Sequence, residues 1–148
     1  MMESAASQYR PADLVLLLGR LLLSLIFLHE GWSLAANLAA AIDTFAKLGL
    51  SAPVVFATIA LQLGAGASVA TGFLGRLGAT ALALFCLATA LLFHTNFGSQ
   101  NELLHFEKDL AIAGGMFVLA ATGAGSISVD NLLKRRTRGI HPWLRAMM

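Results

Sequence analysis

The sequence predicts an all-α integral membrane protein, a bundle of four transmembrane helices with both termini on the cytoplasmic side. Composition, apolar segments and the distribution of basic residues all indicate this class: of the 148 residues, 57% are hydrophobic and only 12% are charged. A soluble protein carries about 25% charged residues. The composition therefore excludes a soluble enzyme, a disordered chain and a nucleic-acid-binding module, and the length indicates a single domain.

Four apolar segments define the helices, because a spanning segment needs about 20 mainly apolar residues and must satisfy its own backbone hydrogen bonds. The first begins at Leu14 and is interrupted by Arg20 and by His29–Glu30. The second begins around Pro53, which a first helical turn tolerates, and ends before Gly75–Arg76. We expect helices over about 14–36, 52–74, 77–94 and 103–124, in a domain 14–125 between a polar N-terminus (1–13) and a basic tail (126–148).

The basic residues give the orientation, because Lys and Arg in short loops stay on the cytoplasmic side. With both termini inside, the outer side holds only Lys47 and Lys108, whereas the inner side holds Arg10, Arg76, Lys134, Arg135, Arg136, Arg138 and Arg145. We therefore predict the N-in, C-in topology. The tail also suits attraction to anionic lipid, and Asp130 is placed to cap a short helix on the inner face.

Small residues recur every four positions along one face of the second predicted helix, at Ala60, Gly64, Ser68 and Gly72. Transmembrane helices associate through close backbone approach at such residues. We expect this face to pack either within the bundle or against another copy of the chain, which would make a homo-oligomer.

Five short strings follow one another along the chain: GRLLLSLIFLHEGW at 19–32, GFLGR at 72–76, FHTNF at 93–97, FEKDLAIAGG at 106–115 and GAGSISVD at 123–130. Together they resemble the DoxX family of small bacterial membrane proteins. The resemblance implies a multi-pass, four-helix protein of the bacterial inner membrane, related to the small subunit of thiosulfate:quinone oxidoreductase and to membrane components of redox-defence assemblies. It does not imply one established activity, because the family is broad.

Arg20 and Gln62 are the supporting polar residues expected inside the membrane, where ionisable groups are costly. Arg20 lies about two turns into the first helix, so its long side chain either snorkels to the headgroups or turns inward to Gln62. Gln62 stands where many members of that family carry an acidic residue. Their contact would therefore be a hydrogen bond, and both interpretations of Arg20 stay open.

The predicted topology gathers most of the remaining polarity at the outer ends of helices one, three and four. The candidate binding residues there are His29, Glu30, His94, Asn96, His105, Lys108 and Asp109. Glu102, His105 and Asp109 share one face of the fourth helix. Asp109 is thus placed to fix the tautomer of His105, which would serve as a ligand or proton carrier.

Four interpretations compete for this cluster. The plainest is a set of hydrated, paired side chains at the membrane interface. The second is a site for a quinone or another small polar-headed ligand, to which histidine and carboxylate groups supply hydrogen bonds and proton transfer. The third is a mixed metal site of the three histidines with Glu102 or Asp109, although the single Glu-x-x-His motif lacks the second copy of a di-iron bundle. Haem held by two histidines is the least favoured, and we expect no metal.

We expect a membrane subunit that anchors or supports a quinone-linked redox complex, with the bilayer and a redox enzyme subunit as its partners and no nucleic acid. The chain contains no flavin, iron–sulfur or nucleotide motif. No cofactor is therefore built in, quinone would be a bound ligand, and any enzymatic role is that of a non-catalytic or quinone-handling oxidoreductase subunit. The alternatives are a membrane protein that binds or transports a lipid or small solute, and a purely structural assembly factor.

Overall fold

The computed structural model describes residues 10–136, a range that contains helices and loops but no strand. The all-α class predicted from the sequence is confirmed. Residues 1–9 and 137–148, which include parts of the predicted N-terminus and basic tail with Arg138 and Arg145, lie outside the described residues. The helices within the described range are α1 (Pro11–Ala36), α2 (Leu38–Lys47), α3 (Ala52–Thr71), α4 (Gly75–Phe93), α5 (Gln100–Thr122) and α6 (Val129–Arg136).

Three of these helices, α1, α3 and α4, are long and apolar enough to cross a membrane. Their 26, 20 and 19 residues correspond to about 39, 30 and 28 Å of helix, against a hydrocarbon core of about 30 Å. The fourth predicted span corresponds to α5, which has 23 residues but carries Glu102, Glu107, Lys108 and Asp109 in its first half. By composition α5 is not one of the three candidate spans.

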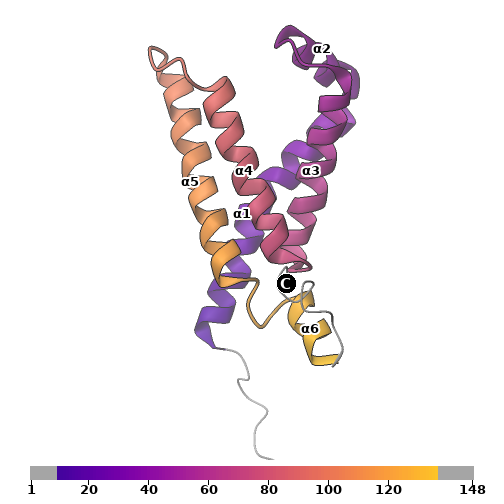
Figure 1. Cartoon of the computed structure of the whole chain (residues 1–148), viewed down its shortest axis with the longest axis vertical. Helices are drawn as coiled ribbons and strands as arrows, with labels where there is room; N and C mark the ends of the chain where they lie inside the picture. Colours follow the sequence, from indigo (N-terminus) through magenta and orange to yellow (C-terminus); the bar gives the residue numbers. More distant parts are fainter. Residues whose placement is uncertain (1–9, 137–148) are drawn as a thin grey trace, which may run out of the picture.

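The long helices pack in two pairs, α1 with α3 and α4 with α5, and α3 also packs against α4. In Figure 1 the two pairs diverge toward the end where α2 lies, while α6 lies near the opposite end. We call these the α2 end and the α6 end. The helix α2 lies between the first two predicted spans, where no helix was predicted, and Asp43 and Lys47 form an ion pair of 2.6 Å on it.

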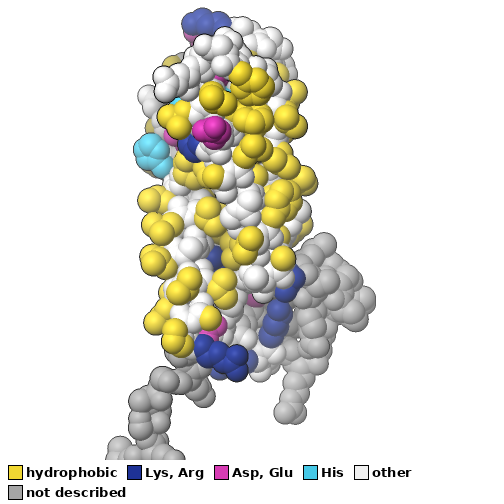
Figure 2. Space-filling view, turned by 90° about the vertical axis from the view of Figure 1, so that its left-hand side faces the viewer, with side chains coloured by type: hydrophobic (Ala, Val, Ile, Leu, Met, Phe, Trp, Pro, Cys, Tyr) yellow, Lys and Arg dark blue, Asp and Glu magenta, His cyan; other side chains and the backbone are white. Residues whose placement is uncertain are grey.

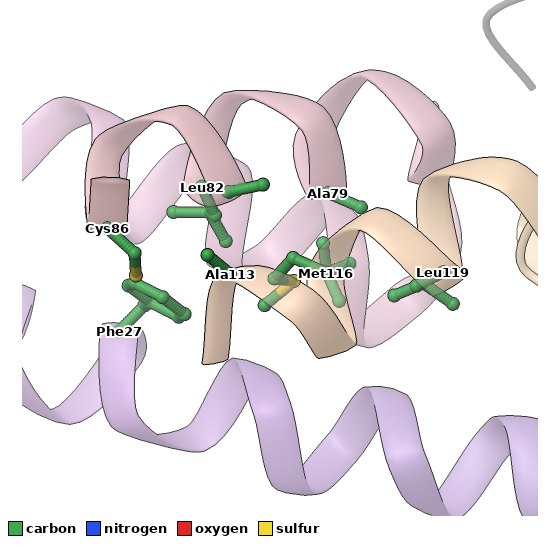
Figure 3. Packing of buried hydrophobic residues seen from close by; sticks show 9 residues of the cluster. Phe27, Ala79, Leu82, Cys86, Ala113, Met116 and Leu119 are labelled. Carbon is green, nitrogen blue, oxygen red and sulfur yellow. The ribbon is translucent and has the colours of Figure 1, made fainter. Parts of the chain in front are cut away.

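The core lies mainly between α4 and α5, with Phe27 contributed by α1 and Val69 by α3. In Figure 3, Phe27 lies against Cys86 of α4, while Leu82 and Met116 meet between α4 and α5. The free thiol of Cys86 is buried, where a cysteine acts as a small apolar side chain. The four long helices are therefore held by one continuous apolar cluster.

The outward faces of these helices are apolar as well. Leu22, Leu92 and Val118, from three different helices, are each more than 60% exposed. Figure 2 shows hydrophobic side chains over the middle of one face, with most charged and histidine side chains nearer the two ends. Soluble monomers rarely expose apolar patches larger than a few hundred Å², so this surface is suited to contact with lipid.

Small residues bring the helices together, but only some of them belong to the predicted face of Ala60, Gly64, Ser68 and Gly72. A Cβ on Gly31 would lie 3.0 Å from Leu63, and one on Gly66 would lie 3.1 Å from Leu28, so these glycines mark the close approach of α1 and α3. Gly64 has nothing within 4 Å. The reason is the rotation of α3, whose buried positions are Val55, Gln62, Gly66 and Val69.

A buried arginine ties the helices together at the α6 end. Arg20 is 1% exposed, and its guanidinium donates to the carbonyl oxygens of Ala124 at 2.6 Å and Ile127 at 2.8 Å. The bond to Gln62 is therefore not formed, and the guanidinium is buried inside the protein. The segment after α5 folds back beneath α1 and offers Arg20 these carbonyl groups instead.

Asp130, also 1% exposed, completes this arrangement. Its carboxylate accepts hydrogen bonds from the backbone N–H groups of Leu74 (2.8 Å) and Gly75 (3.1 Å), and its own N–H donates to the carbonyl of Gly72. Asp130 therefore caps the start of α4, whereas the expected cap of the short helix α6 is provided by Ser128. We call Arg20, Gly72, Ala124, Ile127 and Asp130 the polar clasp.

Candidate functional site

A cavity of about 230 Å³ lies between α1, α3, α4 and α5, in the half of the molecule toward the α2 end. Each of the four helices contributes at least one side chain to its wall. Apolar groups form one part of the lining and polar or ionisable groups the other. The lining residues of this α2-end cavity are Ile26, Phe27, Glu30, Gln62, Phe85, Cys86, Thr89, His94, Lys108, Asp109 and Ile112.

Two polar contacts join α4 and α5 beside the cavity. The hydroxyl of Thr89 donates to Oδ2 of Asp109 at 2.9 Å. Just beyond the end of α4, Nδ1 of His94 lies 2.9 Å from Oε2 of Glu102, and both side chains are partly buried. These contacts hold one carboxylate and one imidazole in fixed positions at the cavity wall.

The second histidine of this region, His105, packs against the first. The rings of His94 and His105 are 5.2 Å apart between centroids and stand edge to face at 77°. Nδ1 of His105 is buried and has no hydrogen-bond partner among the residues that the structure describes. The expected pairing of His105 with Asp109 is not formed, because Asp109 is turned toward Thr89 on the neighbouring helix.

His29 does not join the other two histidines. Its side chain is 75% exposed and contacts only the adjacent Glu30, at 3.8 Å. The expectation that three imidazoles share one pocket is therefore wrong. Successive side chains on a helix point about 100° apart, so His29 points away from the cavity that the adjacent Glu30 lines. Asn96 lies exposed in the loop between α4 and α5 and is not part of the lining.

Gln62 of α3 is the most deeply buried polar side chain in the cavity wall, at 7% exposed. Its Oε1 atom has no hydrogen-bond partner within residues 10–136. A buried amide without a partner costs about 1–3 kcal/mol of stability. Gln62 therefore marks an unfilled hydrogen-bonding site at the cavity. It does not contact Arg20, the partner that the sequence suggested for it.

Thr89 and the aromatic residues Phe27 and Phe85 also line the cavity, although they were not among the predicted site residues. Thr89 was detectable in principle, because it is the one hydrogen-bonding side chain in the outer half of an otherwise apolar helix. The aromatic residues carry no such signal, since they look like ordinary lipid-facing or core residues. Within the described range, no group of three His, Cys, Asp or Glu side chains is arranged to hold a metal ion.

Comparison with known proteins places the chain in a class of small multi-pass membrane proteins. The DoxX family model matches residues 15–95, more than half of the chain. Two similar proteins of Escherichia coli strain K12 are the inner membrane protein YqjF, 36% identical over 84% of this chain and 95% of the relative, and the inner membrane protein YphA, 29% identical over 78% and 88%. No solved structure matches.

The chain belongs to the DoxX family and is a multi-pass protein of the bacterial inner membrane. The matched segment reaches from α1 through the end of α4 and includes His94. Lys108 and Asp109 lie beyond it, on α5. The α2-end cavity is thus formed partly by the matched segment and partly by the chain that follows it.

Proposed function

We propose that this protein is the quinone-handling membrane subunit of an oxidoreductase complex. The observation that carries the proposal is the α2-end cavity, a pocket of mixed polarity among helices whose outward faces are apolar. Membership of the DoxX family supports a membrane role but does not specify a ligand. The proposal therefore depends on the chemistry of the cavity wall.

We also propose α5 as the fourth span and both termini as cytoplasmic. Its 23 residues make about 34 Å of helix, and it packs along α4 with Met116 and Leu119 in the core. The charged first half of α5 then lies at the periplasmic interface, where Lys108 and Asp109 face the cavity. A fourth span completes the bundle and returns the chain to the side on which it began.

The size of the cavity suits a quinone head group. Pockets for whole drug-sized ligands run from about 300 Å³ upward, so the volume of about 230 Å³ holds a ring but not a long tail. The aromatic side chains of Phe27 and Phe85 provide flat apolar surface for such a ring. The apolar tail of the quinone would leave between the helices into the lipid.

The polar side of the cavity matches the two carbonyl oxygens of a quinone. The Lys108 ammonium and the amide N–H groups of Gln62 are hydrogen-bond donors for these oxygens, whereas the unpaired Oε1 of Gln62 would accept from the hydroxyl of the reduced quinol. His94, held in place by Glu102, carries an imidazole that can donate or accept a proton. Reduction of a quinone adds two electrons and two protons: His94 and Asp109 would transfer the protons, and a flavin or iron–sulfur centre in a partner subunit would supply the electrons.

The test measures quinone that copurifies with the full chain after mild detergent extraction, by mass spectrometry of the extracted ligand. Gln62→Leu is the sharpest variant, because Gln62 makes no hydrogen bond to the described protein and its replacement leaves no partner unsatisfied. We expect Gln62→Leu and Lys108→Met each to lower quinone retention by up to about tenfold per lost hydrogen bond. Thermal stability should stay unchanged or rise.

His29→Ala is the matched control, since His29 lies at the same end but outside the cavity. It should retain quinone at the wild-type level. Equal retention in all variants, or the absence of quinone from the wild type, would contradict the proposal. Retention of a phospholipid or solute that depends on Gln62 and Lys108, without quinone, would instead indicate the binding or transport function.

A further inference from the structure

A second polar pocket lies at the α6 end, on the opposite side of the core from the α2-end cavity. It has a volume of about 110 Å³ and is lined, among others, by Arg76, Thr122, Ser128, Asp130, Asn131 and Lys134. The pocket is bounded by the start of α4, the end of α5 and the helix α6. We call it the basic pocket. Its position at the ends of two long helices places it at the depth of lipid headgroups.

The charges of the basic pocket do not cancel. Neither Arg76 nor Lys134 forms an ion pair with any carboxylate between residues 10 and 136. The carboxylate of Asp130 is already engaged by the N–H groups of α4 and by the positive charge of Arg20. The pocket therefore presents two cationic side chains whose charge no neighbouring carboxylate neutralises.

The guanidinium of Arg76 is only partly used. Nη1 donates to the carbonyl of Ala120 at the long distance of 3.3 Å. Its Nε and Nη2 atoms lie over Gly123, where a Cβ would be 3.2 to 3.3 Å from them. Two donors in a planar fork are the arrangement with which arginine binds a phosphate in bidentate geometry. The amide of Asn131 donates one N–H to the carbonyl of Ser126 and has a second N–H for a ligand, whereas the hydroxyl of Thr122 already donates to the carbonyl of Val118.

An apolar groove adjoins the basic pocket. The groove has a volume of about 190 Å³, runs between α1 and α5, and is lined by side chains such as Val15, Leu16 and Val118. Thr122 lines both the groove and the basic pocket. A polar, cationic site that continues into an apolar groove fits an amphiphilic ligand better than a free ion.

We propose that the basic pocket binds the phosphate group of an acidic phospholipid, with one acyl chain lying in the groove between α1 and α5. Arg76 and Lys134 contact the phosphate, and the lipid's net negative charge offsets theirs. This site is independent of the proposed quinone function, because it shares no lining residue with the α2-end cavity. The bound lipid would fasten α6 to the ends of α4 and α5.

The experiment is native mass spectrometry of the intact full chain released from nanodiscs that contain equal amounts of phosphatidylglycerol and phosphatidylcholine. We expect the wild type to retain phosphatidylglycerol preferentially. Arg76→Gln and Lys134→Gln should each lower this retention by about fivefold, the effect of one basic residue at a membrane surface. Lys134→Gln is safe for folding, since Lys134 has no hydrogen-bond or ion-pair partner in the described part of the chain.

Arg135→Gln is the matched control, because it removes the same charge from the next residue of α6 but outside the pocket. It should retain the lipid as the wild type does. An equal loss in Arg135→Gln would show diffuse surface attraction and overturn the proposal. So would a lack of preference for phosphatidylglycerol, or its displacement by millimolar inorganic phosphate, which would identify a free-phosphate site.

Discussion

Gly72 is the residue on which the local conformation of the polar clasp depends. Its φ of +68° lies in the left-handed region, which costs a residue with a Cβ about 1–2 kcal/mol. A Cβ at this position would also meet the Nη1 atom of Arg20 and lie 2.6 Å from Cβ of Ser128. The turn between α3 and α4 therefore requires glycine for both backbone and contact reasons.

We predict that Gly72→Ala destabilises the folded protein by about 2–5 kcal/mol, the combined cost of the left-handed conformation and of overpacking. The check is the thermal unfolding midpoint of the purified protein in mild detergent. Gly64→Ala is the control, because Gly64 is helical and has nothing within 4 Å. A midpoint that falls as far in Gly64→Ala as in Gly72→Ala would contradict this account.

Side-chain direction explains which candidate site residues the sequence could identify. The polar end of the molecule was recognisable from His94, Lys108 and Asp109, which depart from an apolar background and all line the cavity. The rotation of each helix was not recognisable. A change of one residue turns a side chain by about 100°, and this separates His29 from the cavity that its neighbour Glu30 reaches.

At the scale of elements, α4 begins without a cap of its own. Its first residue follows Leu74, which has a φ of +50°, and no local side chain accepts its free N–H groups. The carboxylate of Asp130 supplies this function from a segment more than fifty residues later. The start of one long helix therefore depends on the position of the chain around α6.

We predict that Asp130→Ala removes the hydrogen bonds that cap the first turn of α4, so this turn opens more often while the rest of the helix stays folded. Loss of a helix cap costs about 1–2 kcal/mol, so amide hydrogen exchange at Leu74 and Gly75 should accelerate by about 5- to 30-fold. Ser128→Ala is the comparison variant and should accelerate exchange at Asn131 of α6. Unchanged exchange at Gly75 in Asp130→Ala would show that α4 does not need this cap.

The sequence predicted the long helices because their long, mostly uncharged apolar segments are the strongest pattern in the chain. The helix α2 was missed because its ten residues are too few for a span. The contacts of Arg20 and Asp130 were also beyond prediction, since they join positions about 50 to 110 residues apart. Local patterns specify elements, whereas such pairings follow only from how the elements pack.

At the scale of the whole molecule, the proposed topology makes the loop between α4 and α5 periplasmic and α6 cytoplasmic. The reason is the excess of Lys and Arg on the α6 side. In a Cys86→Ala background, a cysteine at Asn96 should react with a membrane-impermeant maleimide in intact cells. A cysteine at Arg135 should react only after the cells are opened, and both positions are exposed. The reverse pattern would show the opposite orientation.

The buried guanidinium of Arg20 has a consequence for how the protein is made. Its two acceptor carbonyls follow it by 104 and 107 residues, so the first span is synthesised long before those groups leave the ribosome. During that interval the guanidinium lacks these two acceptors, and a charge inside a span costs up to about 2.5–3.5 kcal/mol on insertion. The native hydrogen bonds of Arg20 therefore form only after synthesis has passed the end of α5.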